Sequence, residues 1–116
     1  MSGRQAEEQV ARLLEERGYR ILHRNFRAGR WEADIVAWKD GLYVFVEVKA
    51  RGGRGFGSPG EAVTREKRRR LEAVARYFLA GKRGGNCRFD VALVSLGKAG
   101  VVEEVVILED AFRPWD

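Results

Sequence analysis

The sequence of 116 residues has few of the residues that build disulfides, zinc sites or membrane spans. It contains one cysteine and two prolines, and His23 is its single histidine. One cysteine excludes an internal disulfide framework and any zinc site with several cysteines, and one histidine excludes a histidine pair for metal binding. No apolar run approaches the roughly 18 residues of a transmembrane helix, and no signal-peptide pattern is found. We therefore expect a soluble, cytoplasmic protein with no membrane partner.

The charge of the chain is unevenly distributed. Hydrophobic residues make up 45% of the sequence, which is enough for a folded globule, and the length fits one domain over residues 1–116. The formal charge is +5, but segment 51–83 holds ten basic and three acidic residues, so it carries +7 and the remainder −2. Such a segment suits a phosphate-binding surface, although a solvated helix face explains a lone basic run at least as well. The candidate nucleic-acid contacts are Arg51, Arg54, Lys67, Arg68 and Arg69.

Hydrophobic periodicity predicts seven elements in the order α-β-β-β-α-β-β. Apolar residues spaced three to four apart predict helices over 3–17 and 61–80. Asp40-Gly41 predicts a tight hairpin between two strands, and the glycine-rich segment 52–60 is expected to form a loop that acts as a flap over nucleic acid. We expect an α/β fold with a mixed central sheet and flanking helices. The predicted strands are residues 19–26, 31–38, 42–49, 88–96 and 101–108, the last at a sheet edge.

The strand predicted over residues 42–49 ends in two charged residues on one face. Because side chains alternate along a strand, Glu47 and Lys49 share the face of Tyr43 and Phe45. Burying charge is costly unless the charge is paired or binds a metal ion. A strand end that emerges into solvent has the same pattern, so Glu-x-Lys alone is a weak signal.

Asp34 lies inside an apolar strand, where aspartate is uncommon. In the predicted hairpin Asp34 opposes Glu47, and Glu32, whose role the residues leave open, opposes Lys49. Two carboxylates about 5 Å apart repel each other unless a cation lies between them, and Mg²⁺ or Mn²⁺ suits such oxygen ligands. Lys49 would then orient a water or stabilise charge on a phosphoryl group. The alternative is a salt bridge of either acid with Lys49 or an arginine.

Several short stretches match one family in order along nearly the whole chain. They are Gly3-Arg4-Gln5-Ala6-Glu7, Arg24-Asn25, Trp31-Glu32-Ala33-Asp34-Ile35-Val36, Val44-Phe45-Val46-Glu47-Val48-Lys49-Ala50-Arg51, Phe56-Gly57-Ser58-Pro59, Lys67 and Arg88-Phe89-Asp90-Val91. On these residues the sequence resembles the YraN-type family of small bacterial endonuclease-like proteins. That family belongs to the PD-(D/E)xK, restriction-endonuclease-like superfamily and is similar to archaeal Holliday junction resolvases. Ala33 replaces the usual proline, and Trp31 replaces the usual glycine.

The resemblance implies a restriction-endonuclease-like fold and a metal-dependent nuclease core. By analogy, Asp34 and Glu47 bind Mg²⁺ or Mn²⁺, with the main-chain carbonyl of Val48 as a further ligand. Lys49 assists the attacking water. Glu7, from the first helix, completes the acidic cluster, a role that the residues alone do not indicate.

Three classes of function stay open at this point. The first is a nuclease that hydrolyses DNA phosphodiesters, with branched DNA among its candidate substrates and a homodimer as a candidate assembly on two-fold-related strands. The second is a non-catalytic nucleic-acid-binding module on the same fold. Clustered acids favour the enzyme, because a pure binder gains nothing from acids near phosphate. The third is an interaction scaffold that uses the apolar C-terminal residues Phe112, Pro114 and Trp115, which we instead expect to fold back onto the core.

Overall fold

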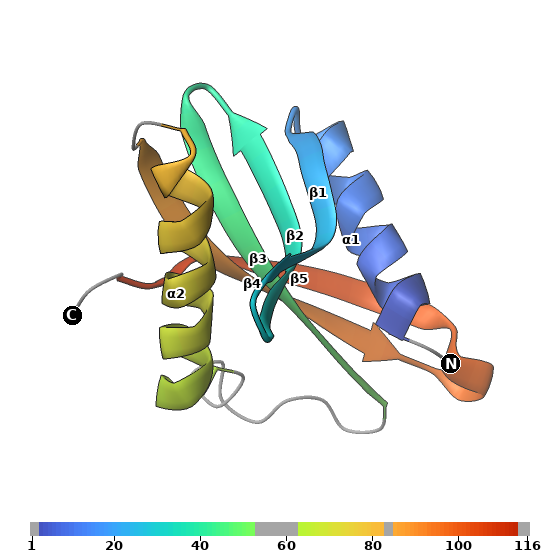
Figure 1. The fold of residues 1–116 in the computed structure, drawn as a ribbon. Helices are drawn as coiled ribbons and strands as arrows, with labels where there is room; N and C mark the ends of the chain where they lie inside the picture. The colour runs from blue at the N-terminus through green and yellow to red at the C-terminus, as the bar shows by residue number, and fades with distance from the viewer. Residues whose placement is uncertain (1–2, 53–62, 83–84, 114–116) are drawn as a thin grey trace.

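A mixed sheet with one helix on each face makes up the part of the chain described in the computed structural model, residues 3–52, 63–82 and 85–113 (Figure 1). Its five strands follow the order β1-β2-β3-β4-β5. The pair β3–β4 is parallel and the other neighbours are antiparallel. This confirms the predicted α/β class and element order. The elements are α1 (Gly3–Glu16), β1 (Arg20–Ala28), β2 (Trp31–Lys39), β3 (Leu42–Gly52), α2 (Arg65–Ala80), β4 (Asn86–Leu96), the short 3₁₀ helix η2 (Lys98–Gly100) and β5 (Val102–Phe112).

Each face of the sheet buries its own apolar layer. Alternation along β3 sends Phe45 to the layer under α2 and Val46 to the layer under α1. Glu47 and Lys49 have the parity of Phe45, so they belong to the face that α2 covers. Neither helix in the described residues is long and apolar enough to cross a membrane. Buried members of the two layers include Val36, Phe89, Leu71 and Phe78 under α2, and Ile35, Val44, Val10 and Leu14 under α1.

Two predicted boundaries differ by four residues from the structure, and the others differ by three or fewer. Helix α2 begins at Arg65, not at residue 61, because the Thr64 hydroxyl caps the helix by accepting a hydrogen bond from the Lys67 N–H at 3.2 Å. Strand β5 lies at a sheet edge, as predicted, but it continues to Phe112 through Asp110, which has a left-handed φ of 54°. Most of the glycine-rich segment, including Arg54, lies outside the described residues, so the predicted flap stays a prediction.

The hairpin register is as predicted near the turn and changes beyond it. Pairing between β2 and β3 runs from Lys39–Leu42 to Ile35–Val46 and ends there. Beyond that point β2 pairs with β1, and β3 pairs with β4 out to Gly52 (Figure 1). The predicted pairing of Glu32 with Lys49 is therefore wrong, because Glu32 lies opposite Arg27.

Candidate functional site

The two carboxylates that the sequence singles out meet where β2 and β3 separate. Asp34 Oδ2 accepts a hydrogen bond from the Val48 N–H at 2.7 Å, so this side chain continues the contact where the backbone ladder ends. The pKa of Asp34 is raised to about 7, first by burial and then by a hydrogen bond and charge repulsion from Glu47. The structure thus brings Asp34 and Glu47 together, as the predicted hairpin requires.

The main chain of Val48 faces the same corner. In a strand, the N–H and the C=O of one residue point to the same neighbour. Because the Val48 N–H points to Asp34, its carbonyl oxygen lies on that side too. The corner therefore offers oxygens from two carboxyls and one main-chain carbonyl, which are hard ligands of the kind that Mg²⁺ and Mn²⁺ prefer. A divalent cation would also relieve the repulsion that raises the pKa of Asp34.

Basic side chains surround the carboxyl pair. Lys67 Nζ of α2 lies 3.8 Å from Glu47 Oε2. The pKa of Lys49 is lowered, chiefly by the positive charge of Lys67 and then by burial, with a smaller contribution from Arg51. Lys67 of α2 and Arg51 of β3 thus each lie close enough to Lys49 to repel its charge. Lys67, which the sequence assigns to nucleic-acid binding, is part of the candidate catalytic site itself.

Glu7 approaches this site from α1. Its pKa is raised, mainly by burial and next by the charge of Asp34, while a hydrogen bond with Asn25 acts in the opposite direction. Within residues 3–52, 63–82 and 85–113, no three acidic, histidine or cysteine side chains converge closely enough to hold an ion. Glu7 and Asp34 therefore interact through their charges, and the predicted role of Glu7 as a metal ligand stays a prediction.

A cavity of about 230 Å³ opens next to the carboxyl pair. We call it the carboxylate pocket, and Asp34, Glu47 and Lys67 line it together with Arg30, Trp31, Glu32, Arg70 and Leu71. The indole ring of Trp31 has two cationic neighbours, since the Arg30 guanidinium carbon lies 4.5 Å and that of Arg70 4.8 Å from the ring centroid. The sequence reasoning missed Arg30 and Arg70 as pocket residues. The spacing of Arg70, three residues after Lys67 on one helix, was the available signal.

The remaining predicted contacts among the described residues do not line the carboxylate pocket. Arg51, the neighbour of Lys49, is exposed near the end of β3. Arg68 and Arg69 do not line the carboxylate pocket and instead border a larger cavity between α2 and the end of β5. Arg54 lies outside the described residues. The basic run of α2 thus serves two pockets rather than one.

A separate buried ion pair lies on β4, in a stretch that the family resemblance includes. Asp90 is fully buried, and Arg88 donates to both of its oxygens, from Nε at 2.8 Å and from Nη2 at 2.7 Å. The Asp110 N–H donates a further hydrogen bond at 2.9 Å, and Arg88 also donates to the Tyr19 hydroxyl at 2.6 Å. This pair ties β4 to β5 and to the segment after α1, and it lines neither pocket described above.

Comparison with known proteins places the chain in one family. A model of the uncharacterised protein family UPF0102 matches residues 6–94. A UPF0102 protein of Caldicellulosiruptor saccharolyticus is 42% identical over 95% of both chains, and one of Symbiobacterium thermophilum is 47% identical over 84% of this chain and 85% of its own. A third, from Moorella thermoacetica, is 43% identical over 95% of this chain and 93% of its own. The chain therefore belongs to the UPF0102 family, to which the YraN-type proteins that its sequence resembles also belong.

Proposed function

We propose that this protein is a cytoplasmic, Mg²⁺- or Mn²⁺-dependent nuclease that hydrolyses phosphodiester bonds of DNA, with branched DNA among its candidate substrates. One observation carries the proposal: two carboxyls, Asp34 and Glu47, lie together in a pocket that Lys67 also lines. Buried or half-buried like charges are unfavourable, so a pair of this kind points to function rather than stability.

Each residue of the pair and its neighbours has a role in this proposal. Asp34, Glu47 and the Val48 carbonyl would hold the ion, and Glu7 would add negative charge from α1. When bound, the ion polarises the phosphoryl group and lowers the pKa of the attacking water. Lys49 holds that water and opposes the negative charge that develops on the phosphoryl oxygens. The water oxygen gives up a proton to solvent and bonds to phosphorus as the bond to the departing sugar oxygen breaks, and the departing oxygen takes up a proton from solvent.

The direct test is cleavage of linear, nicked and four-way branched DNA with Mn²⁺, Mg²⁺ or EDTA. We expect metal-dependent cleavage by the parent and a loss of about 100-fold or more in Lys49→Ala, the range for removal of a group that stabilises charge in the transition state. Lys98→Ala, an exposed lysine of η2, is the matched control and should cleave like the parent. A folded parent that never cleaves, or a Lys49→Ala variant that cleaves like the parent, contradicts the proposal.

The second candidate function has a distinct outcome in the same assay. A non-catalytic nucleic-acid-binding module would bind the same DNA with a strong salt dependence and leave it intact under every metal condition. Sedimentation of the free protein and of its DNA complex would test the expected homodimer.

A further inference from the structure

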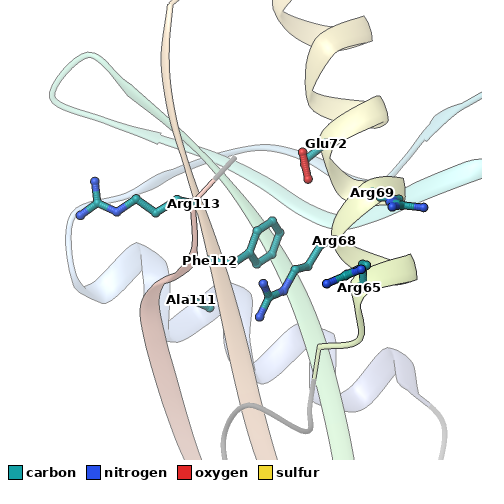
Figure 2. Close-up of a pocket in the computed structure, with 7 residues that line it drawn as sticks. All are labelled: Arg65, Arg68, Arg69, Glu72, Ala111, Phe112 and Arg113. Carbon is teal, nitrogen blue, oxygen red and sulfur yellow. The ribbon is translucent and has the colours of Figure 1, made fainter. Parts of the chain in front are cut away.

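A second cavity, larger than the carboxylate pocket, lies away from the carboxyl pair. It has a volume of about 590 Å³, between the N-terminal half of α2 and the end of β5 (Figure 2). We call it the arginine pocket. Four arginines and one acid border it, a formal charge of 4 − 1 = +3. Its main lining residues are Arg65, Arg68, Arg69, Glu72, Phe112 and Arg113.

The arginine pocket has a rigid wall. The Arg68 side chain extends from α2 toward Phe112, and its guanidinium carbon lies 5.4 Å from the ring centroid (Figure 2). Phe112 is buried and stacks on Phe89, with ring centroids 4.8 Å apart. Arg113, just after β5, lines the far end of the cavity, and its Nη2 lies 3.7 Å from Asp110 Oδ2. Arginines from α2 and from the residue after β5 therefore line one cavity, so they form more than the exposed face of one helix.

Helix geometry links the arginine pocket to the carboxylate pocket. At 3.6 residues per turn, Lys67 and Arg70 lie on one flank of α2 and Arg65 and Arg68 on another. The first flank lines the carboxylate pocket and the second lines the arginine pocket. The first two turns of α2 therefore separate the two pockets and present positive charge to both.

We propose that the arginine pocket binds backbone phosphates of the same DNA whose scissile phosphate lies in the carboxylate pocket. Guanidinium groups form paired hydrogen bonds with phosphate oxygens, and a cavity with four of them suits a polyanion better than an apolar ligand. The inference rests on the proposed nuclease function, because it takes DNA as the ligand. It adds a second anchoring point that holds the substrate and takes no part in the chemistry.

The binding test uses a fluorescein-labelled 30-base-pair DNA duplex in EDTA, so that cleavage cannot interfere. We expect the double variant Arg65→Gln/Arg113→Gln to bind about tenfold more weakly near 0.1 M salt. The slope of log K against log salt should fall by about 2, close to one unit for each phosphate that the variant no longer binds. Both side chains are exposed, so the variant should fold. Arg12→Gln/Arg17→Gln, on and just after α1, removes the same charge elsewhere and should bind like the parent.

Cleavage assays separate this inference from the proposed function. With Mn²⁺, the pocket variant should show a raised KM on duplex DNA and a parent-like kcat. On bis(4-nitrophenyl) phosphate, a small diester that needs only the carboxylate pocket, it should match the parent. Unchanged affinity and salt slope in the variant would overturn the arginine pocket even if the parent is a nuclease. A parent that binds DNA through these arginines but never cleaves would overturn the nuclease function alone.

Discussion

Asp34 on β2 and Asp90 on β4 belong to the same sheet, but their carboxylates have opposite environments. Asp90 is completely buried, and both of its oxygens accept hydrogen bonds from Arg88, with a further bond from the Asp110 N–H. Asp34 is half-buried, accepts one hydrogen bond from Val48, and has another carboxyl, Glu47, as its neighbour. The first arrangement neutralises an acid inside the fold, and the second sets two acids against each other.

The difference teaches which charges serve the fold and which serve a ligand. Asp90 raises the pKa of Arg88, which is the sign of a favourable ion pair. Glu47 raises the pKa of Asp34, which is the sign of an unfavourable one. A protein keeps such a pair where function offsets the lost stability. Replacement by asparagine should therefore affect the free energy of unfolding in opposite ways at Asp34 and at Asp90.

Asp90→Asn should have the largest effect on stability. The change leaves the Arg88 guanidinium largely buried without its carboxylate, which costs about 3–5 kcal/mol of the free energy of unfolding. Urea unfolding measures the loss. Glu109→Gln is the control, because Glu109 is an exposed partner of Arg88 at 3.6 Å and its loss should cost about 1 kcal/mol or less. An Asp90→Asn variant as stable as the parent would contradict a structural role.

Divalent metal should stabilise the carboxyl pair next most strongly. A ligand that binds the folded state at 100 times its Kd adds about 2.7 kcal/mol to the free energy of unfolding. We expect Mn²⁺ to raise the Tm of the parent and EDTA to reverse the rise. Asp34→Asn and Glu47→Gln should lose most of it. An equal rise in Tm in the parent and in both variants would show that Mn²⁺ binds at another site.

The pH dependence of stability should separate Asp34 from the exposed acid Glu8. The pKa of Asp34 is raised from 3.8 to about 7, so between these values the folded protein keeps a proton that the unfolded chain has lost. The stabilisation is therefore complete below about pH 4 and is lost as pH rises to about 7, on the order of 4 kcal/mol. Asp34→Asn should remove this part of the slope in urea unfolding series from pH 4 to 8.

Glu8→Gln tests the sign of the same effect on an exposed acid. The pKa of Glu8 is lowered by its hydrogen bond and charge interaction with Arg24. Its small contribution is present above the unfolded pKa and is lost as pH falls. The two variants should therefore change the slope in opposite directions, and parallel curves for parent and Asp34→Asn would contradict the raised pKa.

Lys67→Gln should have the smallest effect and should act on Lys49. The charge of Lys67 is the main cause of the lowered pKa of Lys49, so its removal should raise that pKa toward the usual range. Competitive labelling of Lys49 with an acylating reagent across pH 7–11 would report the shift. Arg76→Gln, an exposed basic residue further along α2, is the control and should leave the labelling curve of Lys49 unchanged. An unshifted curve in Lys67→Gln would show that burial dominates.

Much of the fold and part of the site could be predicted from the pattern of residues. Asp40-Gly41 and the apolar runs on both sides are local signals, and they correctly paired β2 with β3 and set Asp34 near Glu47. The same reasoning wrongly extended the ladder to Glu32. A hairpin signal sets the register near the turn. It carries no information about where backbone pairing ends, which here is where the Asp34 side chain accepts the hydrogen bond from Val48.

By itself the sequence determined the order of elements, the hairpin register and the two acids that end up together, because each depends on local periodicity and turn chemistry. Only the tertiary structure decided what lies next to them. Packing of α2 over β3 places Lys67 against Glu47, and the end of β5 places Arg113 at the cavity that the arginines of α2 also line. It also decided which further groups hold the two aspartates, because the Asp110 N–H that binds Asp90 and the Val48 N–H that binds Asp34 lie on other strands of the folded sheet.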